Sequence, residues 1–500
     1  MRKRNVDTAE ENSMRGVEEN SMRGVEENSM RGVEDYKYHF TIYHDHTGGG
    51  MRGEYTLFTV TSGVKLTNFL FVSDSSGAKF EAGSEAINNT FNGQAYIESG
   101  ASVSGKTVNR GTIYGNGGSI NGSIENSGSI FLSSGSLNAS VDNESSAILS
   151  GGKEGPVFVY GSVRGGSLQG LMDFKAGAIL GVADLRTVTN IASGAVINLT
   201  KGVKLRGAIT NNGTLGLYSS NVENVSITNS GVIYGGTSGD SVDIRSLITI
   251  DGGSLSGLFD FNTAVTLNSI SITTDARLNF HTYPIFGGEI ANAGTLDFSA
   301  LSSVAANVSG TGTIQGAASG KLVWYGRLSG GHITGNITFA SGSTFTNGTI
   351  NAGALADFSR GSSLGGTITN AGTLDVSALG SVSANVSGTG TIQGGTSSAV
   401  NWYGRLSGGH ITGNITFAQG ATLSGTITND GTLDVSALGS VSANVSGTGT
   451  IQGGTSSAVN WYGRLSGGHI TGNITFASGS TFTNGTINAG ALADFSRGSS

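Results

Sequence analysis

The sequence predicts an all-β protein, a parallel β-solenoid whose coils of about 19–20 residues stack on one another. Three observations predict this fold. A short motif recurs at regular spacing, short segments alternate between apolar and polar residues, and the 500-residue chain holds 84 glycines but only 2 prolines. The segments between glycines are too short for helices, and proline would remove donors from a strand ladder. The expected form is a right-handed β-helix.

The recurring motif is Asn-x-Gly-x-[Ile/Leu]. It begins at Asn109, Asn126, Asn211, Asn229, Asn292, Asn351, Asn370, Asn429 and Asn488. From Asn292 onward the numbering of these copies advances in steps of 59, 19, 59 and 59. Because 59 is close to three times 19–20, each long repeat is expected to form three coils, and the extra short step one more. Stacked coils tolerate such an insertion because each coil contacts only its neighbours.

The strands are predicted from segments that alternate, such as Thr-Ile-Thr at 367–369, Thr-Leu-Asp-Val at 373–376 and Ile-Thr-Gly-Asn-Ile-Thr-Phe at 411–417. Alternate residues point to opposite faces of a strand, so Ile, Leu, Val and Phe are expected inside and Thr, Asn and Asp outside. The Asn-Ala-Gly and Asn-Asp-Gly segments are interpreted as turns, because Asn and Gly tolerate positive φ. Asn and Ile are expected to stack as ladders on successive coils.

Four regions follow along the chain. Residues 1–35 hold a tandem octad at 10–17, 18–25 and 26–33 and are expected to form a disordered arm. Residues 36–55 are expected to form a transition or capping strand. Divergent coils follow at 56–290 and similar three-coil repeats at 291–500, with room for about 22 coils in all. Two other interpretations of the arm stay open: it binds a partner, or translation starts at a later Met.

Composition excludes several classes of protein. Cysteine is absent, which excludes disulfides and thiolate metal sites. The net charge is −7 without a basic stripe, so nucleic acid is not an expected partner. No apolar run has the ~18 residues of a membrane helix, and no apolar segment of a signal peptide follows the basic residues 1–4. Acids and bases balance within 291–500, so this region lacks strong self-repulsion and can associate side by side.

One motif is a candidate ligand site. Trp-Tyr-Gly-Arg-Leu-Ser-Gly-Gly-His occurs three times, and the numbering advances by 78 and then 59 between successive copies, which is expected to be four and three coils. Aromatic rings with Arg and His suit stacking on a sugar and hydrogen bonding to it. The other interpretation, which we favour, is an aromatic corner that covers a loop and was copied by duplication. The candidate ligand-binding residues are Trp324, Tyr325, Arg327, His332, Trp402, Tyr403, Arg405, His410, Trp461, Tyr462, Arg464 and His469.

Other chemistry is weakly indicated. His44 and His46 share one face of an expected exposed strand, but no third metal ligand is near in the sequence. Asp297, Asp375 and Asp434 hold equivalent positions three or four coils apart, too far for the paired carboxylates of a glycosidase. We therefore predict no catalytic residue, no metal and no cofactor.

Two further motifs are poor candidates for a chemical role. Asp430 lies closer to Asp434, but its equivalents are Ala293 and Ala371, so that pair is not repeated. The Gly-Thr-Gly-Thr segments at 310–313, 388–391 and 447–450 are interpreted as turns, because no helix and no Lys follow as in a phosphate-binding loop.

The region 56–500 resembles the passenger domains of bacterial autotransporter adhesins, of the self-associating or diffuse-adherence type. The motif Ile-Thr-Asn-Ala-Gly-Thr-Leu-Asp and the stretch 103–113, Val-Ser-Gly-Lys-Thr-Val-Asn-Arg-Gly-Thr-Ile, carry this resemblance. It implies a protein at the cell surface or secreted, associated with the outer membrane, without a cofactor. The implied partners are a host surface glycan or protein, or other copies of the chain.

Such adhesins also have an N-terminal signal and a C-terminal barrel, and neither is recognisable here. Residues 478–500 repeat 341–363 identically and then stop, so we expect a fragment of a longer adhesin. Two alternative functions stay open: a polysaccharide-binding or polysaccharide-degrading β-helix, and a fragment without function.

Overall fold

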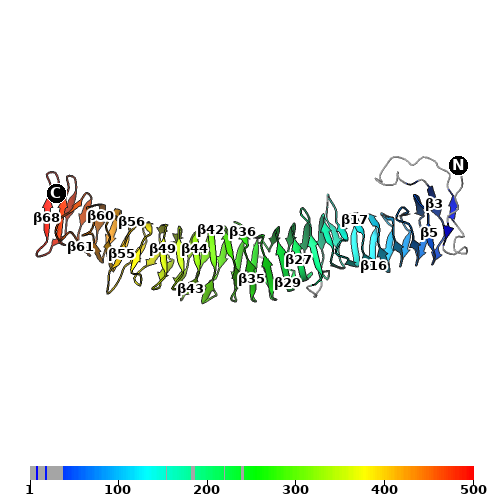
Figure 1. The fold of residues 1–500 in the computed structure, drawn as a ribbon, viewed down its shortest axis with the longest axis horizontal. Coiled ribbons are helices and arrows are strands. Elements are labelled where there is room, and N and C mark those ends of the chain that lie inside the picture. Colours follow the sequence, from blue (N-terminus) through cyan, green and yellow to red (C-terminus); the bar gives the residue numbers. More distant parts are fainter. Residues whose placement is uncertain are drawn as a thin grey trace. The chain divides into compact units, whose positions relative to one another are not determined.

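The computed structural model describes residues 36, 38–153, 155–181, 186–218, 220–237 and 241–500, together with strands β1 (Asp7–Thr8) and β2 (Val17–Glu19). Within these residues the protein is all β, and parallel strands stack as a β-solenoid of about 25 turns (Figure 1). The chain divides into two compact units, Met1–Phe259 and Asp260–Ser500. The described part holds no helix long and apolar enough to cross a membrane. The predicted fold class is confirmed.

Segments in which apolar and polar residues alternate form strands, as predicted. In β45 (Asn336–Phe339), Ile337 and Phe339 are fully buried, whereas the two polar residues between and before them are partly exposed. Apolar residues then stack on the same position of the next turn: the rings of Phe339 and Phe358 lie 4.7 Å apart and nearly parallel. Leu296, Ile314 and Ile333 form such a stack over consecutive turns. Each turn buries only a few apolar side chains, so the core is a column that grows with every added turn.

The turns vary in length, and many of them are shorter than predicted. We call residues that pair on successive turns a column. Thr369, Ser387, Ser407 and Ser424 are consecutive partners in one column, so three turns extend only from position 369 to position 424. One of the shortest steps joins Val400 in β55 (Val400–Trp402) to Ile415 in β57 (Asn414–Phe417). Shorter turns explain why the chain completes about 25 turns and not the 22 expected.

One sequence repeat is therefore longer than three turns. The residue equivalent to Thr369 in the next repeat is Thr428, which lies beyond Ser424 in the sequence. Thr428 pairs with His410, and His410 pairs with Thr391, so Thr428 belongs to a different column from Thr369. Each repeat is thus rotated about the solenoid axis relative to the repeat before it. The rotation corresponds to one of the strand segments that make up a turn. The expectation of three whole coils in each repeat was wrong on this point.

The Asn-x-Gly motif forms ladders, as predicted, but for another reason. The side-chain nitrogen of Asn109 donates to Asn126 over 2.7 Å, and that of Asn126 donates to Asn143 over 2.7 Å, all three residues being buried. These asparagines point inward and have ordinary φ angles. The glycine is required because a Cβ at Gly431 would lie 1.9 Å from the backbone oxygen of Gly413 on the preceding turn.

The turn explanation holds only for two copies of this motif, those at Asn351 and Asn488. Their glycines, Gly353 and Gly490, have φ angles of 78° and 82° and no neighbouring atom where a Cβ would stand. Both copies continue with Ala-Leu, and their asparagines are partly exposed. One sequence motif thus serves two backbone geometries.

The described residues of the region 36–55 form strands of the first turns. Strands β3 (Tyr38–Ile42), β4 (His46–Thr47) and β5 (Gly50–Arg52) each pair in parallel with a strand of the next turn. The predicted disordered arm, residues 1–35, lies outside the described residues except for β1 and β2. These two strands pair antiparallel with β5 and β3.

Candidate functional site

The three tryptophans of the candidate site belong to the core. Trp324 in β43 (Leu322–Tyr325), Trp402 in β55 and Trp461 in β62 (Val459–Trp461) are all 0 % exposed. Each pairs in register with a phenylalanine of the next turn. The prediction that they contact a ligand is therefore wrong, because no sugar can reach these rings. Their alternation with a buried residue two positions earlier, as in Val400-Asn401-Trp402, is the pattern that indicates burial.

The tyrosines that follow the tryptophans are exposed. Tyr325, Tyr403 and Tyr462 are 50 %, 57 % and 57 % exposed. Each precedes a glycine at a sharp corner, where a Cβ would lie 2.0–2.4 Å from the backbone oxygen of an alanine on the preceding turn. At this corner the backbone packs so closely against the preceding turn that only glycine can follow the tyrosine. The tyrosine side chain itself points outward. The glycines are Gly326, Gly404 and Gly463.

The arginines after the glycines are held by their backbone. The N–H of Arg327 donates to the side-chain oxygen of Asn307 over 3.0 Å, and Arg405 and Arg464 donate to Asn385 and Asn444 over 2.8 and 2.9 Å. All three arginines are exposed. Each copy thus presents a tyrosine and an arginine at one corner, and this pair is what remains of the predicted ligand site.

The three histidines lie in three different columns. His332 pairs with Thr313 and Thr349, whereas His410 pairs with Thr391 and Thr428. His469 pairs with Thr450 and Thr486. Because the repeats are not whole numbers of turns, the three copies are directed to different sides of the unit Asp260–Ser500. The structure does not bring the three copies together into one site.

One histidine has a carboxylate partner. His410 Nε2 lies 2.8 Å from Asp430 Oδ2, and Asp430 Oδ1 accepts hydrogen bonds from the backbone N–H and the hydroxyl of Thr448, at 3.1 and 3.0 Å. The Thr448 N–H first, then His410 and the Thr448 hydroxyl, lower the pKa of Asp430 below its ordinary value. The residues twenty positions after the other two histidines are alanines, so this pair is specific to one copy.

The His410 side chain also lines a cavity of about 630 Å³. Asp375, Gln393, Thr389 and Thr391 line it as well. The partner of Asp430 in the structure is thus His410, beside a polar hollow.

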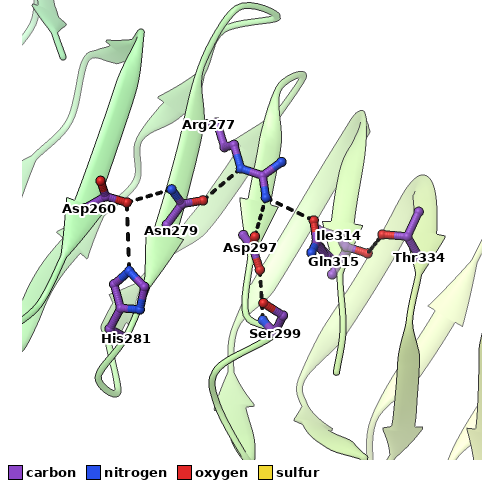
Figure 2. Close-up of polar contacts among 9 residues, drawn as sticks. All are labelled: Asp260, Arg277, Asn279, His281, Asp297, Ser299, Ile314, Gln315 and Thr334. Carbon is purple, nitrogen blue, oxygen red and sulfur yellow. Dashed lines mark hydrogen bonds and ion pairs between the residues drawn. The ribbon is translucent and has the colours of Figure 1, made fainter. Parts of the chain in front are cut away.

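A polar ladder runs along one side of the second unit (Figure 2). Asn279, Asp297, Gln315 and Thr334 are consecutive in one column. Arg277 links three of them: Nε donates to Asn279 over 2.8 Å, and a terminal nitrogen donates to Asp297 and to Gln315. Asp297 is 8 % exposed and is bonded on both sides, since Oδ1 accepts the N–H of Ser299. This carboxylate therefore holds the ladder together.

A different column places two carboxylates on adjacent turns. Asp357 in β48 (Leu355–Phe358) pairs in register with Asp375 in β51 (Thr373–Asp375), a neighbour that the sequence analysis missed. Asp357 belongs to Ala-Asp-Phe and not to Thr-Leu-Asp, so motif comparison did not align the two. Lys321 Nζ lies 2.5 Å from Asp357. The hydrogen bond and the charge of Asp357, with a contribution from Asp375, raise the pKa of Lys321.

The expected metal ligands near the N-terminus are not arranged as predicted. His44 is exposed, but His46 is 8 % exposed and its ring lies against Phe69, with ring centres 6.4 Å apart. The backbone between them is not a strand, so they do not share a strand face. Among the described residues there is no group of three or more His, Asp or Glu side chains that could hold a metal ion.

No protein-family model matches the chain, and no curated protein matches its sequence. The class of molecule is therefore defined by the fold and its surface alone. It is a β-solenoid that carries repeated tyrosine and arginine corners and polar ladders on its outside.

Proposed function

We propose that this chain is the passenger part of a bacterial cell-surface adhesin. It attaches cells to host surfaces, to extracellular matrix or to one another through the lateral faces of its β-solenoid. Its partners are a host surface glycan or protein, or other copies of the chain. It acts by binding, at the cell surface or as a secreted protein associated with the outer membrane.

The observation that carries the proposal is the display of three equal corners. Tyr325, Tyr403 and Tyr462 are each held outward at a glycine corner, and each is followed by an exposed arginine. The three corners belong to different columns, so partners can be engaged from several sides of the solenoid. Weak contacts that are engaged together give strong attachment, because the second contact is intramolecular.

Binding is proposed in preference to catalysis because the strongest carboxylate candidates are occupied. Asp297 is bonded to Arg277, and Asp357 is bonded to Lys321. Such pairs stabilise contacts between turns and leave the carboxylates without a free acid or base role.

The proposal is tested first on the source cells. Protease treatment of intact cells should remove the chain while a cytoplasmic protein stays intact. In a strain that displays the chain, replacing all three tyrosines, Tyr325→Ala, Tyr403→Ala and Tyr462→Ala, should lower cell attachment or clumping at least tenfold. The matched control replaces Thr334, Thr412 and Thr471, which hold equivalent positions in the three copies, with Ala. Attachment that is equal in both triple variants contradicts the role of the corners.

A second candidate function is polysaccharide degradation. It is favoured by Asp375, which lies beside Asp357 and lines the same cavity as His410. Release of reducing ends from polysaccharides, abolished by Asp375→Asn or Asp430→Ala, supports this alternative. Absence of the chain from the source cells supports a remnant without function.

A further inference from the structure

Four exposed aromatic side chains of the unit Met1–Phe259 lie in or near one column of paired residues. Phe158, Tyr160, Tyr218 and Tyr234 are 39 %, 49 %, 37 % and 38 % exposed. We call them, with the polar residues between them, the aromatic strip. No motif found in the sequence includes these residues, because their neighbourhood depends on which turns they occupy.

Register places the strip along the solenoid axis. Phe158 in β20 (Val157–Val159) pairs with Asp173 in β23 (Leu171–Phe174), and Asp173 pairs with Asn198 in β26 (Val196–Leu199). Asn198 pairs with Gly216 in β28 (Thr214–Gly216), which pairs with Tyr234 in β30 (Val232–Tyr234). The column spans four steps of about 4.8 Å, or about 19 Å.

The edge of the Tyr218 ring lies against this column. A Cβ at Gly216 would lie 2.2 Å from Cε2 of Tyr218 and 2.8 Å from the side-chain oxygen of Asn198. The ring therefore covers the one position in the column without a side chain, directly before Tyr234. A tyrosine side chain has only two rotatable side-chain torsions, so it loses little conformational entropy when a ligand stacks on it.

The centre of the strip is polar and carries balanced charge. Lys175 Nζ lies 3.3 Å from Asp173 and 4.3 Å from the centre of the Phe158 ring. Asn198 donates to the other oxygen of Asp173 over 2.9 Å. One positive and one negative charge cancel, so the strip has no net attraction for an acidic or a basic partner. Along the axis, the polar side chains of Asp173 and Asn198 lie between the Phe158 ring at one end and the Tyr218 and Tyr234 rings at the other.

We propose that the aromatic strip binds a linear, uncharged polysaccharide that lies along the solenoid axis. Sugar rings have an apolar face that stacks on aromatic rings and hydroxyls that bond to carboxylate, amide and ammonium groups. One sugar unit of an extended chain is about as long as one step between turns, so successive sugars meet successive strip residues. The net neutral charge argues against charged polysaccharides and charged peptide segments.

The test uses the purified full chain in affinity electrophoresis. Gels contain hydroxyethylcellulose, galactomannan or soluble starch, all uncharged, or carboxymethylcellulose, which adds charge to a glucan backbone. Wild-type protein should be retarded by at least one uncharged polysaccharide, and Tyr234→Ala should weaken that binding about tenfold. Tyr234→Phe should keep it, and Tyr43→Ala, which removes an exposed tyrosine outside the strip, should leave it unchanged. Thermal unfolding of each variant shows that it is folded.

Three results overturn the proposal: no retardation by any uncharged polysaccharide, retardation by carboxymethylcellulose alone, or equal retardation of Tyr234→Ala and wild type. A chain that binds only a protein partner falls under the first result. The proposal deepens the proposed function, because it names a ligand class for one lateral face. The two fail separately, since polysaccharide binding is measured on purified protein and attachment is measured on cells.

Discussion

The side-chain amide of Asn126 donates to the side-chain oxygen of Asn143 over 2.7 Å inside the first unit, and its own oxygen accepts from Asn109. Asn126 is 1 % exposed. Buried amides of this kind are stabilising only while every partner is present, because an orphaned polar group keeps its full cost of desolvation. The inner ladder therefore links successive turns by hydrogen bonds between buried side chains.

We predict that Asn126→Ala lowers the free energy of unfolding by about 1–3 kcal/mol, because it orphans the partners on both neighbouring turns. The matched control is Asn138→Ala, since Asn138 donates to Asn121 over 3.1 Å on the exposed side of the same strands. That change should cost about 0.5 kcal/mol or less. Urea unfolding followed by circular dichroism measures both, and equal losses would argue against the inner ladder.

The glycine corners give a second prediction. Gly404→Ala places a Cβ 2.1 Å from the backbone oxygen of Ala384, so the preceding turn must move and the protein should lose at least ~1–3 kcal/mol. At Gly380 there is no atom within 4 Å of an added Cβ. Gly380→Ala should be neutral or stabilising by a few tenths of a kcal/mol, since it restricts the unfolded chain. Thermal unfolding of the two variants separates close packing from a general preference for glycine.

The pair of His410 and Asp430 predicts a pH dependence. Its folded state lowers the pKa of Asp430, so the carboxylate adds stability above the unfolded pKa of about 3.9, and this stability is lost as the pH falls through the folded value. Asp430→Asn should therefore be less stable than wild type at pH 6, and the difference should shrink below about pH 4. Unfolding midpoints between pH 2.5 and 7 measure this. A difference that is constant over the whole range contradicts it.

The raised pKa of Lys321 predicts a loss of stability at high pH. The folded state raises its pKa, so its contribution is present below the unfolded pKa of about 10.4 and is lost as the pH rises through the folded value. Lys321→Met leaves Asp357 and Asp375 adjacent without a cation, and should cost up to ~1 kcal/mol at pH 7, because Lys321 is half exposed. The cost should shrink as the pH rises through the raised pKa of Lys321. In the Asp357→Asn background, Lys321→Met should cost less, and a double-mutant cycle measures this coupling.

Much of the fold follows from the residues alone. Alternation in segments such as 367–369 and 373–376 predicts strands, and stacked asparagines follow from the recurring motif. The length of a turn did not follow, because the short step from Val400 to Ile415 depends on how a corner packs against the turn below it. A small error in the length of each turn adds up, so the columns that repeats occupy were assigned wrongly.

The candidate site was predicted only in part, and the reason is the same. Tyr403 and Arg405 are exposed, as the ligand hypothesis requires. Trp402 is two residues after the buried Val400 and therefore points inward as well, which the alternation in the sequence already indicated. The neighbours Asp357 and Asp375 could not be found from spacing, because they meet only when the turn between them is shorter than the predicted coil. Contacts between turns depend on the lengths of all corners between them, and local patterns do not contain that information.

The mismatch between repeat and turn also bears on how such a chain evolves. Unequal recombination between near-identical repeats adds or removes one whole repeat at a time, and each event leaves the inward alternation of every strand intact. The change is therefore compatible with the fold, yet it rotates every corner beyond the exchange point about the solenoid axis relative to the corners before it. A lineage can in this way vary the orientation of its outward residues without a single amino-acid substitution.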